Sequence, residues 1–262
     1  MNVKVRLFLI LLAAGLTGVI SFLLVDLEAL LAMQPLPAGT DMPMSIPMLK
    51  LLSLIQPAVL VAVAAVIGVG LASRVGLRSP VAEAVASRRD VPLAIKSQLV
   101  PGIIGGLAGG VSIVLISAIL KPFLTAEIFA RLGEWGNILP LPVRLLYGGI
   151  TEEVLLRWGM MTLLVWAAWR LFQKGQDRPR PVIVVAAILL SSLTFALGHM
   201  PIAFLLFPEP TLPLILFVIF GNSTFGLIAG WLYWKKGLES AMIAHMIAHV
   251  VMFAASYLGA YF

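Results

Sequence analysis

Seven long apolar runs divide this chain of 262 residues, and each is long enough to cross a bilayer as a helix, which needs about 20 residues. The connections between them are short, so little of the chain remains for a domain outside the membrane. The fourth run is long for one crossing, which predicts a tilted or broken helix. The runs cover approximately Leu7–Val25, Met48–Leu71, Leu99–Leu120, Leu139–Phe172, Val182–His199, Leu212–Trp234 and Leu238–Phe262. The sequence therefore predicts an all-α polytopic membrane protein with about seven or eight transmembrane helices.

Composition supports this class. Hydrophobic residues make up 61% of the chain and charged residues only 11%, whereas a soluble domain carries roughly a quarter charged residues. The absence of cysteine excludes disulfides and thiolate chemistry. The net charge of +6 resides in short loops between apolar runs, which is typical of a membrane protein and not of a nucleic-acid binder. The predicted partner is membrane lipid, with no nucleic acid.

The basic residues predict an orientation. Alternate loops hold only three of them, Lys50, Lys121 and Arg131. The other set of loops holds thirteen: Lys4, Arg6, Arg74, Arg78, Arg88, Arg89, Lys96, Arg170, Lys174, Arg178, Arg180, Lys235 and Lys236. By the positive-inside rule this places the N-terminus in the cytoplasm, and we expect a multi-pass protein of the bacterial inner membrane. The first run resembles a signal peptide, but its length and the lack of a cleavage site predict a retained span.

Three further segments have local signatures. Ser79-Pro80 has the chemistry of a helix start and predicts an interfacial helix. The next segment has helical spacing that predicts a helix on the outer membrane surface, with apolar residues at Leu124, Ile128, Leu132 and Trp135. Small residues in the third run predict close helix packing, at Gly105, Gly106, Gly109 and Gly110.

The most informative residues are ionisable side chains at membrane depth, where each charge costs at least about 2.5–3.5 kcal/mol. They gather in the last four runs, and all three histidines of the chain are among them: Glu152, Glu153, Arg157, His199, His245 and His249. Any one of them alone would more often be a packing feature. Two glutamates, an arginine and three histidines on three spans favour a functional site in an intramembrane cavity.

Helical spacing predicts how these residues meet. Glu153 and Arg157 are four apart and can pair within the bundle, while Glu152 points about 100° away around the helix. His245 and His249 are also four apart and should project side by side. Phe195 shares a face with His199 in the same way.

The chemistry of this set favours a hydrolase. A carboxylate in a cavity of low dielectric is a competent general base near neutral pH, and an imidazole can share in deprotonating a water. Further imidazoles can donate hydrogen bonds to a developing oxyanion. No serine has the setting of a nucleophile, and no aspartate lies inside a span. A metal is the rival mechanism, because Glu152, His199, His245 and His249 form a set that zinc would accept.

The ordered motifs Glu152-Glu153-x-x-x-Arg157, Phe195-x-x-x-His199 and His245-x-x-x-His249 resemble those of the CPBP family. These are the CAAX-processing and bacteriocin-processing (Abi) membrane peptidases, related to the Ras-converting CAAX endopeptidase. The resemblance covers about residues 139–253 and implies a peptidase core at 136–255, after amino-terminal spans at 1–135. It implies an intramembrane endopeptidase that acts on a peptide or protein substrate.

The resemblance also implies roles. Glu152 would be the general base and His199 would help to activate water, while His245 and His249 would form the oxyanion site. Glu153 and Arg157 would hold the helix geometry. His249 stands where the eukaryotic CAAX enzymes carry Asn, and because histidine also binds metals, the cofactor stays open between a divalent ion such as zinc and none.

The residues alone are also consistent with two other functions. One is a non-catalytic membrane scaffold or immunity protein of the same fold. The other is a proton-coupled transporter, since Glu and His inside spans also build proton relays. Depth is a further open point. His245 lies seven residues into the last run, about 10 Å from the cytoplasmic face, whereas Glu152 and His199 should lie about 25 Å from it.

Overall fold

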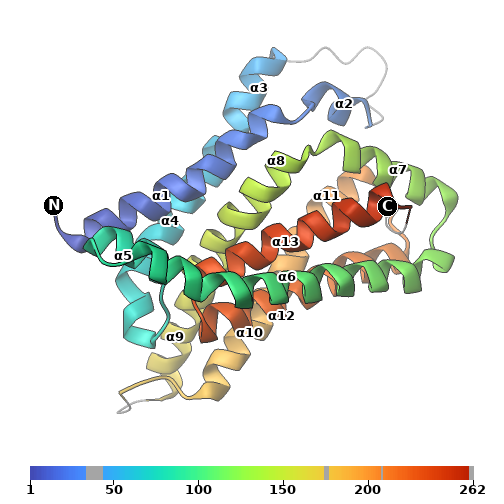
Figure 1. Cartoon of the computed structure of the whole chain (residues 1–262). Coiled ribbons are helices and arrows are strands. Elements are labelled where there is room, and N and C mark those ends of the chain that lie inside the picture. Colours follow the sequence, from blue (N-terminus) through green and yellow to red (C-terminus); the bar gives the residue numbers. More distant parts are fainter. Residues whose placement is uncertain (34–43, 174–176, 208, 260–262) are drawn as a thin grey trace.

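The computed structural model describes residues 1–33, 44–173, 177–207 and 209–259. Every element in this part of the chain is helical, as Figure 1 shows. The elements are α1 (Val3–Ser21), η1 (Phe22–Leu24), α2 (Leu27–Ala32), α3 (Ile46–Ser53), α4 (Ile55–Leu71), η2 (Ala72–Val75), α5 (Pro80–Ser87), α6 (Val91–Leu120), η3 (Lys121–Phe123), α7 (Ala126–Ile138), α8 (Leu141–Val143), η4 (Arg144–Glu152), η5 (Val154–Met161), α9 (Thr162–Phe172), α10 (Pro181–Gly198), α11 (Met200–Leu206), α12 (Leu212–Lys235) and α13 (Leu238–Tyr257).

Seven helical segments of the described chain are long and apolar enough to cross a membrane. They are Val3–Leu24, Ile46–Val75, Val91–Phe123, Leu141–Phe172, Pro181–Leu206, Leu212–Lys235 and Leu238–Tyr257. The predicted all-α polytopic membrane fold is therefore confirmed, with one span for each apolar run. The end of the last run, at 260–262, lies outside the described residues, as does Lys174.

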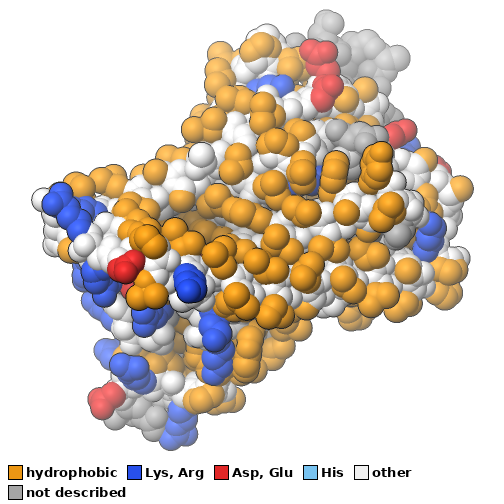
Figure 2. Space-filling model, viewed as in Figure 1, with side chains coloured by type: hydrophobic (Ala, Val, Ile, Leu, Met, Phe, Trp, Pro, Cys, Tyr) orange, Lys and Arg blue, Asp and Glu red, His pale blue; other side chains and the backbone are white. Residues whose placement is uncertain are grey.

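The outer surface of the bundle is apolar. Val66, Ile104 and Leu115 each expose more than half of their surface, and Figure 2 shows hydrophobic side chains over the middle of the molecule. Such a surface is stable against hydrocarbon and not against water. The chain is accordingly a multi-pass membrane protein.

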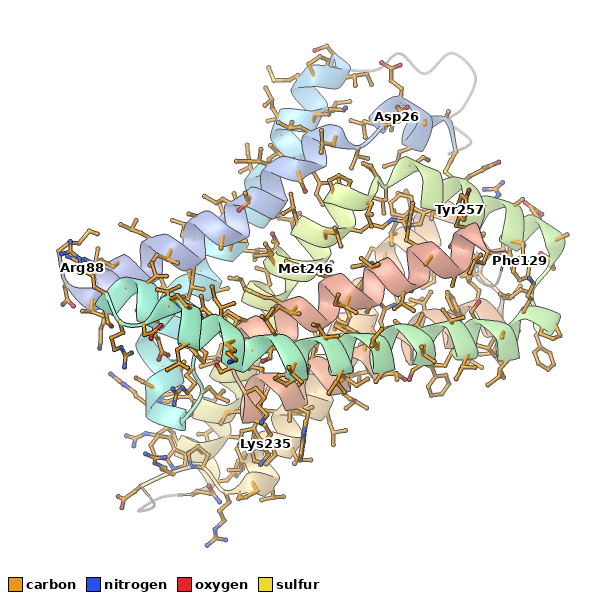
Figure 3. All side chains as sticks on the ribbon, in the orientation of Figure 1. Asp26, Arg88, Phe129, Lys235, Met246 and Tyr257 are labelled. Atoms are coloured by element: carbon orange, nitrogen blue, oxygen red, sulfur yellow. The ribbon has the colours of Figure 1, made fainter. Side chains whose placement is uncertain are left out.

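The two ends of the bundle differ in charge. We call the end that carries the N-terminus, α5 and the α9–α10 connection the basic end, because Lys and Arg gather there (Figure 2). We call the other end, with α2, η3 and α7, the distal end. In Figure 3 Arg88 and Lys235 lie at the basic end, Asp26, Phe129 and Tyr257 at the distal end, and Met246 between the two ends.

The glycines of α6 bring three spans together. A Cβ on Gly106 would lie 2.5 Å from the Cβ of Ile247 in α13, and one on Gly105 would lie 2.6 Å from a methyl carbon of Leu232 in α12. The glycines predicted to allow close packing therefore do so, and they allow α6 to pack against both α12 and α13. This contact fixes α13, which carries two of the histidines.

The fourth span departs from the α-helix that the 3.6-residue spacing assumed. Between α8 and α9 the chain has i→i+5 hydrogen bonding over η4 and η5, the rare π form, which frequently occurs at functional sites. The span is thus continuous and wide rather than broken. Gly148 and Gly149 face His249 and Met246 of α13 in this region, where a Cβ would clash. The wide turn and the two glycines let the fourth span approach α13 closely.

The two predicted interfacial helices exist, but their contacts differ from the expectation. The hydroxyl of Ser79 does not cap α5; it donates to Oε1 of Glu239 in α13 at 2.5 Å. The backbone N–H of Leu238 also donates to the carbonyl of Arg78, so α5 covers the start of α13. At the distal end, the apolar face of α7 packs on the protein rather than lying on the membrane, with Ile128 in a cluster that includes Leu214.

Candidate active site

Three structural elements hold the ionisable residues. Glu152, Glu153 and Arg157 lie on the π-helical part of the fourth span. His199 occupies the bend between α10 and α11. The remaining two residues, His245 and His249, lie on α13.

Glu153 is the centre of a fully buried network. Its Oε2 lies 3.2 Å from Nε of Arg157, so the pair predicted from the i, i+4 spacing is present. Its Oε1 accepts a hydrogen bond from Nδ1 of His245 at 2.9 Å. Both glutamate and arginine have a relative exposure of 0%. Because a lone buried charge is expensive, the ion pair and the histidine keep this carboxylate stable inside the bundle.

The contact between Glu153 and His245 goes beyond the sequence prediction, which gave Glu153 a role within its own helix. A carboxylate oxygen can only accept, so Nδ1 of His245 donates and the Nε2 edge of the ring is left to face the cavity. Nothing in the sequence indicated this pairing, because the two residues are 92 positions apart.

Glu152 has a different environment from its neighbour. Its side chain is 19% exposed and its Oε2 lies 3.9 Å from Nε2 of His245. It lines a cavity, whereas Glu153 is sealed in the core. His245 therefore stands between two carboxylates, one on each side of its ring. A partly accessible carboxylate beside an imidazole is an arrangement suited to general acid–base chemistry.

His199 is oriented by its own helix end. Its Nδ1 lies 2.8 Å from the carbonyl oxygen of Phe195, and since a carbonyl only accepts, Nδ1 carries the proton. The neutral ring then presents an acceptor at Nε2. The rings of Phe195 and His199 meet edge to face at 4.8 Å, as their shared face predicted. His199 lines the same cavity as Glu152.

The two histidines of α13 lie side by side, as their spacing predicted. Their rings are stacked, with centroids 4.9 Å apart and planes 10° apart. The ring of Phe225 packs against His245 at 4.3 Å, and Phe195 meets it edge to face at 5.8 Å. Aromatic packing thus holds His245 in place, while His249 faces Gly148.

The cavity that these residues line has a volume of about 520 Å³. Glu152, His199, His245 and His249 all line it. Sequence reasoning missed several other lining residues, among them Tyr147, Asn222 and Trp135. Asn222 is a polar residue within an apolar run, and that was the one signal available in the sequence for any of them. Its side-chain amide donates to the carbonyl of Val218.

The apparent mismatch in depth is resolved by the packing of the basic end. The sequence prediction assumed that every span starts at the same aqueous face. The α12–α13 turn is covered by α5 instead: Gly237 lies against Pro80, and Leu238 is fully buried. The last span therefore begins below the surface, and His245 reaches the level of Glu153 after seven residues.

The four candidate metal ligands do not converge. Among the described residues, no three His, Cys, Asp or Glu side chains are arranged so that they could hold a metal ion. His245 uses Nδ1 to bind Glu153, and its ring is stacked on that of His249 rather than aimed with it at one point. The side chains in this arrangement do not fit a metal, so no step proposed below passes through one.

Comparison with known families decides the assignment. Residues 134–251 match the family model described as type II CAAX prenyl endopeptidase Rce1-like. This segment is an Rce1-like domain. The resemblance of the three motifs to CAAX-type proteases is thereby confirmed at the level of the family. No curated protein and no solved structure matches the chain.

The Rce1-like domain contains all six of the ionisable residues. It begins near the end of α7, so Trp135, which lines the cavity from that helix, belongs to it, whereas most of α7 lies before it. The family is one of proteases, which are hydrolases. The spans before α7 lie outside the matched segment, yet α6 packs against α12 and α13 of the domain.

Proposed function

We propose that this protein is an intramembrane endopeptidase that hydrolyses a peptide bond with a water activated by Glu152. The observation that carries the proposal is the pair of adjacent glutamates in opposite environments. Glu153 is sealed and paired, whereas Glu152 reaches a cavity that also holds three histidines. Membership in a family of CAAX-type proteases supports the same reaction class.

In the proposed reaction, a water lies between the carboxylate of Glu152 and Nε2 of His199. Glu152 takes a proton from the water, with His199 sharing in the deprotonation as its oriented Nε2 allows. The oxygen attacks the peptide carbonyl, the C–O bond forms, and the proton passes to the leaving nitrogen as the C–N bond breaks. Both histidine and glutamate return to their starting states.

The oxyanion formed in this step needs hydrogen-bond donors. His245 and His249 are the proposed donors, and such groups act strongly where water is excluded. His245 donates from Nε2 only when that nitrogen carries a proton, because Nδ1 is engaged with Glu153. Glu153 and Arg157 are positioning residues, since they fix His245 and do not touch the cavity.

The substrate is a peptide or protein that meets the cavity from within the membrane environment. Most of the lining is apolar and includes Phe195, Phe217 and Phe225. Such a wall favours apolar side chains around the scissile bond. The peptidase core is proposed to span 136–255, with the spans of 1–135 supporting it through the contact between α6 and α13.

The proposed location is the inner membrane of a bacterium, with the N-terminus in the cytoplasm. The support is twofold: thirteen basic residues fall in one set of alternate loops predicted from the sequence, and in the described part of the chain Lys and Arg gather at the basic end (Figure 2). Positively charged loops are retained on the cytoplasmic side. The distal loops hold only Lys50, Lys121 and Arg131.

The function can be tested before any substrate has been identified. Peptide termini are compared in membranes from cells that express the wild type, Glu152→Gln or His199→Ala at matched levels. We expect new termini with the wild type alone, because both variants lose a group that activates water. Termini that persist in either variant contradict the assignment. Identical termini in all samples, with a cellular effect that survives Glu152→Gln, indicate a scaffold instead.

A further inference from the structure

The cavity occupies only one half of the bundle. In the fourth span it is lined by residues from Val143 to Glu152, the part that lies toward the distal end, and in α13 it is lined from His245 to Met252. The same holds on the other spans. Their lining residues lie toward the distal end too, and they are Phe22, Ile113, Phe195, Gly198, His199, Ile202, Ala203, Leu206, Leu214, Phe217, Val218, Gly221, Asn222 and Phe225.

The other half of the bundle is closed beneath the site. Trp158 and Tyr233 are 1% and 0% exposed and their rings meet edge to face. The hydroxyl of Tyr233 is hydrogen-bonded to that of Thr162 at 2.7 Å, and Met161 has no exposed surface. With Arg157 and Glu153 these side chains fill the space between the cavity and the basic end. In the described part of the chain, buried side chains therefore separate the cavity from the basic end.

The rim of the cavity is formed by distal elements. Leu132, Trp135 and Leu139 line it from α7 and its end, and all three are partly exposed. Gly198 lines it from the end of α10 and is exposed, with no atom within 4 Å of a Cβ built there. The route to Glu152 therefore starts at the distal end or at the adjoining flank of the bundle.

The basic end lies on the opposite side from this route (Figures 2 and 3). If positive loops stay in the cytoplasm, the distal end faces the other side of the membrane. We propose that the catalytic cavity is entered from the non-cytoplasmic side, so that its substrates are apolar polypeptide segments at the outer leaflet. This inference rests on the proposed function and on the proposed orientation, and it excludes substrates confined to the cytoplasm.

The apolar character of the proposed substrate follows from the chemistry of the cavity walls, and its location at the outer leaflet follows from the direction of entry. The lining combines aromatic and aliphatic side chains with a guanidinium, that of Arg144, near the rim. An extended segment that leaves the bilayer, such as the region next to a membrane anchor or a secreted peptide, offers apolar side chains and an accessible backbone. A folded soluble protein does not fit a cavity of about 520 Å³.

The natural absence of cysteine makes the test direct. Single cysteines are introduced at Ala130 on the exposed surface of α7, at Arg89 at the basic end and at Val218 in the cavity wall. A membrane-impermeant maleimide is added to intact cells and to inside-out vesicles. Phe220→Cys, on the lipid-facing side of α12 two residues from Val218, is the matched control for cavity water.

We expect A130C and V218C to be labelled in intact cells and R89C only in inside-out vesicles, with labelling of F220C at background in both. Labelling of V218C from the same side as R89C would overturn the proposal. Labelling of A130C from the cytoplasmic side would overturn it too, because the distal end would then face inward.

A second measurement separates sidedness from catalysis. V218C labelling is repeated in the Glu152→Gln background, where it should be unchanged because accessibility needs no reaction. One apolar reporter segment is then placed on either side of a single-span anchor. Cleavage of the outer reporter alone supports the proposal, and cleavage of the cytoplasmic reporter alone contradicts it. If neither reporter is cleaved while V218C is labelled from outside, the peptidase function fails and the direction of entry stands.

Discussion

The two halves of this bundle contain similar residue types that have different roles. Between the site and the basic end, polar side chains are sealed and paired, as in the contact of Glu153 with Arg157 and that of Thr162 with Tyr233. Toward the distal end, Glu152 and His199 line open space. Adjacent carboxylates thus fall on either side of one boundary. Environment, and not residue type, therefore separates the buried Glu153 from Glu152, the carboxylate that we propose to be reactive.

The largest expected effect is on stability, and it concerns the half of the bundle between the site and the basic end. Arg157→Ala leaves the buried carboxylate of Glu153 without its cation, and breaking such a pair destabilises a protein by about 3–5 kcal/mol. We expect a large fall in the unfolding temperature measured in detergent. Arg170→Ala, an exposed arginine on the same span, is the control and should change stability by about 0.5 kcal/mol or less. If both variants lower the unfolding temperature equally, the pair of Glu153 with Arg157 does not stabilise this half of the bundle.

A change in the half that contains the cavity should affect activity more than stability. A Cβ at Gly148 would lie 2.5 Å from Nε2 of His249, so Gly148→Ala must displace that ring. Misplacing a catalytic group by about 1 Å reduces rates by about 100-fold. Gly221→Ala is the control, because Gly221 lines the same cavity and its Cβ meets no atom within 4 Å. Cleavage rates of purified protein provide the readout.

If Gly221→Ala loses as much activity as Gly148→Ala, the loss comes from a narrower cavity, and the placement of His249 is not the cause. If neither loses activity, His249 does not need its present position, and its proposed role at the oxyanion is wrong.

The smallest expected effect concerns the hydrogen bond beneath the site. Thr162→Val removes one partner and leaves the buried hydroxyl of Tyr233 unsatisfied, which costs about 1–3 kcal/mol. The double variant Thr162→Val with Tyr233→Phe removes both partners and should be more stable than the single one. Thermal unfolding measures this difference. A double variant that is less stable than Thr162→Val would contradict the view that the cost of the single variant comes from the unsatisfied hydroxyl of Tyr233.

Much of the fold followed from the sequence. Hydropathy alone predicted all seven spans, because lipid requires a helix wherever an apolar run is long enough. The glycines of α6 predicted its close packing, and small residues have few other uses at a helix interface. The π-helical turns of the fourth span were not predictable, since hydrogen-bond register depends on what the helix packs against. The contact of α7 with Leu214 was hidden for a similar reason: apolar spacing predicts a buried face without naming its partner.

The candidate site was predictable in part. Helical spacing anticipated the pair of Glu153 with Arg157 and the side-by-side placement of the two α13 histidines, though not the stacking of their rings. The bond from His245 to Glu153 depends on how α13 sits against the fourth span, which no local pattern encodes. The depth of His245 was misjudged because only the tertiary contact of α5 with Glu239 shows that the last span starts beneath the surface.

The most direct test of the account compares purified wild-type protein with Glu152→Gln in lipid nanodiscs, on a substrate taken from the new membrane termini. Cleavage rate and unfolding temperature are measured on the same samples. We expect Glu152→Gln to lower the rate by about 100-fold to 10,000-fold, the usual contribution of a general base, and to leave the unfolding temperature within a few degrees of the wild type. Cleavage at the wild-type rate by the folded variant would contradict the proposed role of Glu152.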